Sequence, residues 1–320
     1  MRVIHQIRYL LNHLQLVYPP ISNQEGDWLW RDEEVRETVK SSKVYMIGHR
    51  NELFFERFNF IPAGGGILVF RIKMGEIISP LITYNIRSEL EHLIEDNDEI
   101  DLEIGPKLMR FTLNGSANVI KWFTPDIFLF LYWRKQINVN VYGDFDFRRF
   151  TNFELYYVGI SKRGDSFSRL FDQAHHGRLK ILTNAQTKNY GSRLTDELTI
   201  FMFDIDKINI NIFNTEDDLK QDMNYITDAE AVIADAEKAF IKLLKTEYNE
   251  VTYQNFPQST DGLYNERLAR YGYSIQEDIT FYTDSIEFKG YFDLRAINDF
   301  ILVEGDTAKV VKASDAQTED

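Results

Sequence analysis

The sequence predicts an α+β protein with mainly antiparallel sheets. Aromatic residues make up 14% of the chain, and such side chains fit the pleated surface of strands. Short apolar runs, such as residues 155–160 and 198–204, are bounded by polar residues, as buried strands are. Residues 229–245 instead carry apolar side chains at helical spacing. Strands joined by turn sequences, with separate helices, indicate the α+β class.

The chain is expected to form two domains and a tail. A length of 320 residues is enough for two substantial cores. We expect an N-terminal α+β domain over residues 1–136 and a second domain, with a C-terminal extension, over residues 137–303. Residues 304–320 contain few large apolar side chains, so we expect this tail to be disordered.

The predicted N-terminal domain contains helices and strands but no catalytic motif. Apolar residues at helical spacing predict a helix over residues 1–16. Residues 107–113, 117–123 and 127–133 are predicted to be strands joined by turns. Residues 89–103 contain eight acidic residues and no lysine or arginine. Such a run forms either a solvated face or a surface that docks on a basic partner, so we assign this domain to target choice or partner contacts.

The predicted second domain begins with a three-stranded antiparallel sheet. Residues 137–142 alternate apolar and polar side chains, and they would pair with residues 155–160 as a hairpin. Residues 198–204 would provide the third strand. After residue 160, a loop rich in Lys, Arg, Gly and Ser leads into a short helix that would begin at Asp165 or Ser166, because these residue types cap helices.

Charge is distributed unevenly along the chain. The formal net charge of −14 disfavours non-specific adhesion to nucleic acid, whose affinity depends largely on the release of cations from phosphates. Residues 161–193 nevertheless contain seven Lys or Arg against two Asp. A local basic excess within an acidic protein is typical of a binding surface.

Composition also limits the chemistry and the location of the protein. The absence of cysteine excludes disulfides, thiolate metal sites and cysteine nucleophiles, and it suits a cytoplasmic protein. No stretch approaches about 18 consecutive apolar residues, so we expect no membrane-spanning segment.

Two segments, residues 153–184 and 236–257, together resemble the GIY-YIG nuclease domain. In that family a Tyr-Ile-Gly strand is followed by a helix that bears an arginine and then a histidine. A later helix carries a glutamate that binds the metal, and an asparagine follows it. The matching elements occur in this order within residues 137–257: Tyr157-Val158-Gly159, Arg169, His175 or His176, Glu237 and Asn249.

The first half of the family signature, Gly-Ile-Tyr, is matched less closely. Residues 140–142 are Asn-Val-Tyr, so Tyr142 matches the tyrosine of this half, whereas the Gly-Ile pair is not matched. The neighbouring Tyr156 is an alternative. The resemblance implies that Tyr142 and Tyr157 flank the attacking water, and in the family such a tyrosine is proposed as the general base. Each tyrosine could also be a packed strand residue.

The resemblance also implies the roles of the charged residues. Glu237 would hold a single Mg²⁺ or Mn²⁺, which keeps most of its waters and so needs few carboxylates. Arg169 would clamp phosphate oxygens, and His175 or His176 would assist proton transfer. We favour His176 because it shares a helical face with Arg169. Each residue also has a plainer alternative role. Glu237 could be an exposed helical glutamate near lysines, and Arg169 could pair with Asp165 or Asp172. The two histidines could be structural or merely exposed.

Asn249 would anchor the metal-binding helix or the phosphate, unless it only caps the C-terminus of that helix. The basic residues expected to contact nucleic acid are Lys162, Arg163, Arg178 and Lys180.

The expected function is therefore a metal-dependent endonuclease that hydrolyses DNA, in phage defence or a mobile element. A protein partner would bind through the N-terminal domain. The alternative is a catalytically degenerate GIY-YIG fold that serves as a nucleic-acid-binding or protein-assembly module. A third possibility is a purely structural interaction protein.

Overall fold

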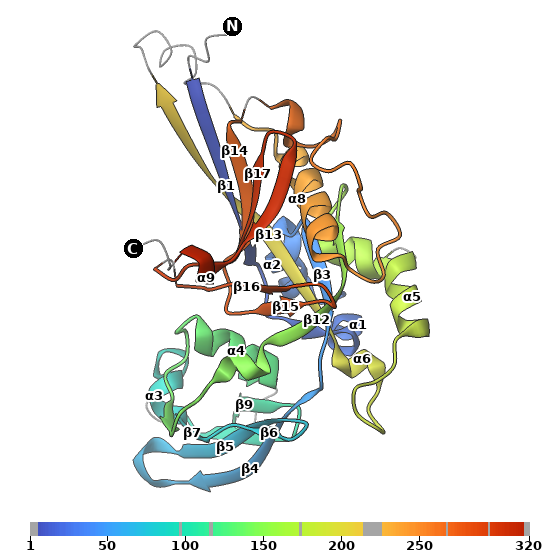
Figure 1. Ribbon diagram of the computed structural model, residues 1–320. Coiled ribbons are helices and arrows are strands. Elements are labelled where there is room, and N and C mark those ends of the chain that lie inside the picture. The colour runs from blue at the N-terminus through green and yellow to red at the C-terminus, as the bar shows by residue number, and fades with distance from the viewer. Residues whose placement is uncertain are drawn as a thin grey trace, which may run out of the picture.

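The computed structural model describes residues 6–95, 98–114, 118–172, 175–213, 226–266, 268–293 and 295–316 (Figure 1). Within these ranges, the strands form one large mixed sheet and two smaller antiparallel sheets, and helices lie between them along the chain. The prediction of an α+β protein with antiparallel sheets in the N-terminal region is confirmed.

The large sheet contains ten strands drawn from both ends of the chain. Two neighbouring pairs, β1 with β14 and β12 with β15, are parallel, and the other pairs are antiparallel. The strand order is β16 (Glu287–Lys289), β15 (Thr280–Tyr282), β12 (Asn152–Ile160), β3 (Val44–His49), β13 (Leu198–Phe213), β1 (Gln6–Leu16), β14 (Arg270–Ile275), β17 (Phe300–Glu304) and β18 (Thr307–Val311), and β2 (Ile21–Ser22) also pairs with β13.

The two smaller sheets lie together in the lower part of Figure 1. The five-stranded sheet consists of β11 (Asn140–Tyr142), β7 (Leu81–Asn85), β5 (Ile67–Met74) and β4 (Leu53–Ile61), with β6 (Ile77–Ile78) beside β5. The three-stranded sheet has the order β10 (Val119–Phe123), β9 (Met109–Leu113), β8 (Ile100–Ile104). Aromatic side chains such as Phe70, Phe111 and Phe123 fill the core of this part.

Helices cover the sheets and carry much of the polar chemistry. They are α1 (Asn23–Leu29), α2 (Glu33–Thr38), α3 (Ile86–Leu90), α4 (Pro125–Trp133), α5 (His176–Asn184), α6 (Leu194–Glu197), α8 (Ala229–Leu244) and α9 (Ala313–Ala316), with a π-helical turn over Ser168–Asp172. The predicted helix over residues 229–245 is present as α8. Within the described ranges, every helix is too short or too polar to cross a membrane.

The predicted boundary near residue 136 does not separate two domains. Strand β3, from the first 50 residues, pairs with both β12 and β13. The chain between β3 and β12 forms the two smaller sheets, so residues 50–151 are an insertion between adjacent antiparallel strands. Sequence patterns show where strands lie but not which distant strands pair, and they led us to join residues 137–142 to β12 instead.

The helix predicted over residues 1–16 is wrong, because residues 6–16 form β1 in the middle of the large sheet. Leu10, Asn12, Leu14 and Leu16 are buried, which is the period of two expected of a strand. The polar Asn12 conceals this pattern in the sequence. Its Nδ2 donates to the Gly272 carbonyl at 3.0 Å, which gives this buried donor a partner.

Two other predictions also differ from the structure. Residues 127–133 belong to α4 rather than to a strand, because Thr124 accepts a hydrogen bond from the Ile127 amide at 3.3 Å and Pro125 begins the helix. The predicted disordered tail contains β18, which pairs with β17, and then α9. Residues 317–320 lie outside the described ranges. Small side chains suffice for this hairpin because β17 supplies the buried Ile301 and Val303.

Candidate active site

A pocket between β12, the π-helical turn, α5 and α8 gathers most of the predicted catalytic side chains. The predicted residues that line it are Tyr157, Arg169, His176, Lys180, Glu237 and Asn249. They come from β12, the π-helical turn, α5, α8 and the loop that follows α8. Figure 1 shows α5 and α8 beside each other, next to the strands of the large sheet.

Tyr142 is not part of this pocket, and its predicted position was wrong. Residues 140–142 form β11, which pairs with β7 in the five-stranded sheet, and the Tyr142 side chain is 65% exposed. The place beside Tyr157 is taken by Tyr45 from β3. Their rings stack with centroids 6.2 Å apart and planes 15° apart. The alternative, Tyr156, points to the His49 side and accepts or donates a hydrogen bond with His49 Nδ1 at 2.8 Å.

Two glycines allow the tyrosines to pack this closely. A Cβ on Gly159 would lie 2.5 Å from the Tyr45 hydroxyl oxygen, and a Cβ on Gly177 would lie 2.4 Å from the Tyr157 ring. Gly159 is therefore required because a larger residue would clash with the Tyr45 side chain, not because another backbone approaches it. Strands β3 and β12 and helix α5 thus fix both phenols from three sides.

The adjacent histidines have different environments. His175 is buried, and its Nδ1 accepts the Arg178 amide at 2.8 Å, so the proton lies on Nε2 and is donated to the Tyr45 hydroxyl at 2.7 Å. Burial, together with the positive charge of Arg169, lowers the pKa of His175 to about 4. His175 is therefore neutral and orients Tyr45. His176 lies at the exposed rim, 3.5 Å from the Glu250 carboxylate.

The positively charged guanidinium of Arg169 lies near the two tyrosines. The nearby carboxylates of Asp165 and Asp172 pair with Arg36 instead, at 3.0 and 3.8 Å. Within the described ranges, the Arg169 guanidinium forms no ion pair or side-chain hydrogen bond. Its charge opposes the rise in pKa that burial causes in Tyr157. A half-buried guanidinium without a partner is suited to an anionic ligand.

Glu237 faces the same pocket from α8 and also lacks an ion-pair partner in the described part of the chain. The neighbouring Lys238 pairs instead with Asp261 at 2.7 Å. The closest hydrogen bond to the Glu237 carboxylate comes from the Tyr253 hydroxyl at 3.4 Å, which is long for such a bond. Burial raises the pKa of Glu237, and the positive charges of Lys238 and Lys162 oppose this rise. Its free oxygens can accept a cation.

Asn249 holds the chain after α8 against the strand that carries Tyr157. Its Oδ1 accepts the Val158 amide at 3.0 Å and its Nδ2 donates to the Val158 carbonyl at 2.8 Å. The Thr246 hydroxyl also donates to the same Oδ1 at 2.7 Å. Asn249 is thus a positioning residue that fixes α8 relative to β12.

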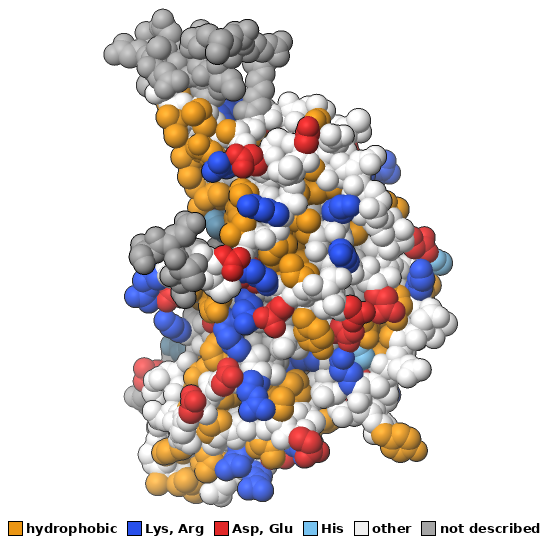
Figure 2. Space-filling model, in the orientation of Figure 1, with side chains coloured by type: hydrophobic (Ala, Val, Ile, Leu, Met, Phe, Trp, Pro, Cys, Tyr) orange, Lys and Arg blue, Asp and Glu red, His pale blue; other side chains and the backbone are white. Residues whose placement is uncertain are grey.

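The four residues expected to contact nucleic acid differ in availability. Lys180 lines the pocket, 3.5 Å from Glu250, and Lys162 and Arg163 are exposed. Arg178 is used internally, because its Nε donates to the Asn23 side chain at 2.6 Å and its guanidinium stacks on Phe171 at 4.1 Å. Figure 2 shows acidic and basic side chains interspersed over the face that it presents, rather than separated.

Tyr45 is the residue that sequence reasoning missed. It lies in the buried run Val44–His49, and six consecutive buried positions are typical of a central strand. About a hundred inserted residues separate this run from β12. Because of this distance along the chain, the sequence did not indicate that Tyr45 lies beside Tyr157.

No family model, curated protein or solved structure matches this chain. Its function is therefore argued from the geometry of the pocket.

Proposed function

We propose that the protein is a metal-dependent nuclease of the GIY-YIG type, which hydrolyses DNA phosphodiester bonds in the pocket lined by Tyr157, Arg169 and Glu237. The observation that carries this proposal is the convergence of Tyr157, which stacks on Tyr45, with an arginine and a glutamate that have no ion-pair partner in the described part of the chain. If Arg169 and Glu237 had only a structural role, we would expect each to form an ion pair with the other or with a neighbouring charged residue. Here both charges remain available for a phosphate and a cation.

The Glu237 carboxylate fits a divalent cation of the Mg²⁺ type. Within the described ranges, no group of three His, Asp or Glu side chains gathers around one point. A lone carboxylate is sufficient for Mg²⁺ or Mn²⁺, which retain waters and take further oxygens from a phosphate. When bound, the cation would neutralise charge on the reacting phosphate and the leaving oxygen.

The other side chains have separable tasks in this proposal. Arg169 would bind non-bridging phosphate oxygens through two parallel N–H donors. Burial raises the pKa of Tyr45 and of Tyr157, so both phenols are protonated at neutral pH, and Tyr157, which lines the pocket, would orient water by hydrogen bonding. His175 fixes the hydroxyl of Tyr45 from behind. The exposed His176 and Lys180 would contact the strand at the rim.

A second candidate is a nucleic-acid-binding or assembly module that keeps the fold without cleavage. The net charge of −14 favours the assembly form of this module, because it disfavours adhesion to nucleic acid. The two candidates share the pocket and differ in whether the phosphodiester is cut.

The test is cleavage of supercoiled and linear DNA with Mg²⁺ or Mn²⁺. We expect the wild type to cut, and Arg169→Ala to lower the rate by about a hundredfold, because losing a charge-assisted bidentate contact costs about 2–3 kcal/mol. The matched control is Tyr142→Phe, which removes a hydroxyl from the other sheet and should cut at the wild-type rate. If the wild type cuts with neither cation, the binding module is the correct alternative.

A further inference from the structure

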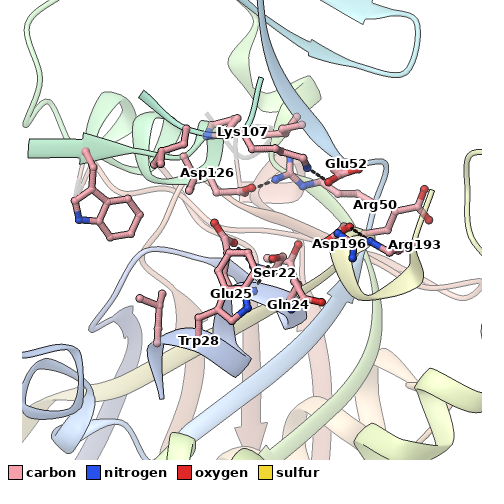
Figure 3. Close-up of a pocket in the computed structure, with 18 of the residues that line it drawn as sticks. Ser22, Gln24, Glu25, Trp28, Arg50, Glu52, Lys107, Asp126, Arg193 and Asp196 are labelled. Atoms are coloured by element: carbon pink, nitrogen blue, oxygen red, sulfur yellow. Dashed lines mark hydrogen bonds and ion pairs between the residues drawn. The ribbon is translucent and has the colours of Figure 1, made fainter. Parts of the chain in front are cut away.

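A second cavity lies where the inserted sheets meet α1, and the proposed nuclease chemistry leaves it unused. It encloses about 480 Å³, which is within the range of small-molecule sites. Its walls come from α1, α6, the β3–β4 connection, the β8–β9 loop and the start of α4. Figure 3 shows Glu25 of α1 on one side, with Asp126, Arg50 and Lys107 opposite.

Most charges around this cavity are neutralised by each other. Arg50 pairs with Asp126, Lys107 pairs with Glu52, and these contacts are drawn in Figure 3. Arg193 pairs with Asp196 at 2.9 Å. The Arg50 guanidinium is fixed further by a bond from Nη1 to the Phe150 carbonyl at 2.5 Å and by stacking on the Phe153 ring. Lastly, Glu197 accepts two backbone amides and contacts His49.

Glu25 is the exception among the charges that line the cavity. In the described part of the chain its carboxylate forms no ion pair, and its hydrogen bond is to the Ser22 amide at 2.6 Å, within the capping box of α1. Burial raises the pKa of Glu25, and the negative charge of Asp126 raises it further. A carboxylate that faces another carboxylate in a desolvated space is stabilised by an added positive charge.

The remaining walls suit a flat apolar body. Trp28 is 66% exposed although it lies on α1 beside Glu25, and Trp122 lines the opposite side. Leu53, Leu108 and Pro125 complete this surface. An indole that remains exposed at the mouth of a cavity gives little to folding, but its face attracts cations and aromatic rings.

We propose that this cavity binds a small organic cation with a flat apolar or aromatic body, such as an amidinium or guanidinium compound. The cationic head would donate two parallel hydrogen bonds to Glu25, and the flat body would lie against Trp28 and Trp122. An anion would meet the Glu25 carboxylate, while a neutral ligand would leave Glu25 without a counter-charge, so the site discriminates by charge.

Benzamidine is the probe, with neutral benzamide and anionic benzoate as isosteric comparisons, and binding to the full chain is measured by calorimetry. We expect saturable binding of benzamidine and no saturable binding of the other two compounds. Glu25→Gln keeps the capping box, because glutamine serves at that position, yet it removes the charge. It should weaken benzamidine binding at least about tenfold, and Trp28→Leu should weaken it several-fold.

The matched control is Glu34→Gln on the exposed face of α2, which should bind benzamidine as the wild type does. The proposal is overturned if benzamidine does not bind saturably at millimolar concentrations, if Glu25→Gln binds it equally well, or if benzoate binds as tightly. Because the test measures binding in a cavity separate from the tyrosine pocket, its outcome is independent of DNA cleavage.

Discussion

Replacing Glu237 with glutamine is expected to lower metal-dependent DNA cleavage by at least about a thousandfold, or about 4 kcal/mol of transition-state stabilisation. Glutamine keeps the size and helix propensity of glutamate but loses the charge that would hold the cation. The free energy of unfolding should change by less than about 0.5 kcal/mol, because Glu237 forms one long hydrogen bond and no ion pair in the described chain. Initial cleavage rates and chemical denaturation measure the two effects.

The control for this prediction is Glu250→Gln in the same pocket. Glu250 lies 3.5 Å from both His176 and Lys180, so its charge is already compensated by the Lys180 ammonium at the rim. We expect this variant to retain most of the wild-type rate. If instead Glu250→Gln abolishes cleavage and Glu237→Gln does not, the cation is held at the rim and the assignment of Glu237 is wrong.

The largest loss of stability is expected from Glu277, which joins the insertion to the large sheet. Its side chain is fully buried and accepts the Leu16 amide at 2.8 Å, the Trp133 indole N–H at 3.0 Å and the Arg134 guanidinium. Glu277→Gln leaves the Arg134 cation largely buried without its counter-charge. We expect the free energy of unfolding to fall by about 3–5 kcal/mol, measured by chemical denaturation.

Two further variants separate this effect from general damage. The double variant Glu277→Leu with Arg134→Met removes both charges, and it should be more stable than Glu277→Gln, because paired charges replaced by apolar groups leave no uncompensated ion. Glu304→Gln breaks an exposed pair with Arg270, and it should cost less than about 1 kcal/mol. A double variant less stable than the single one would show that the hydrogen bonds from Leu16 and Trp133, rather than the uncompensated charge of Arg134, decide the loss.

Much of the pocket could be predicted from the sequence, because its parts lie in segments with strong local signals. Tyr157 is on a strand bounded by polar residues, and Glu237 is on the amphipathic helix α8. The order of the matching segments predicted side chains that line one pocket in the structure. Which role each side chain has remains a prediction.

The partner of Tyr157 could not be found in the same way. Strand pairing depends on contacts between residues distant in sequence, and a hundred-residue insertion separates Tyr45 from Tyr157. Local alternation favoured Tyr142, which does form a strand, but in another sheet. The same limit explains β1, whose buried Asn12 is understandable only beside the Gly272 carbonyl of β14.

The cavity lined by Glu25 could not be predicted from the sequence. Its residues come from α1, α6, the β3–β4 connection and the insertion, and the capping box of Ser22 and Glu25 indicates only the start of a helix. Only the arrangement in space shows that, within the described ranges, Glu25 forms no ion pair while the charged residues around it do.

Binding of Mn²⁺ in the presence of a DNA oligonucleotide, followed by electron paramagnetic resonance, tests the account most directly. The wild type should bind Mn²⁺ at a single site, and Glu237→Gln should weaken this binding at least about tenfold, while Glu250→Gln should not. Equal Mn²⁺ binding by the wild type and by Glu237→Gln would contradict a metal site in the pocket lined by Tyr157, Arg169 and Glu237.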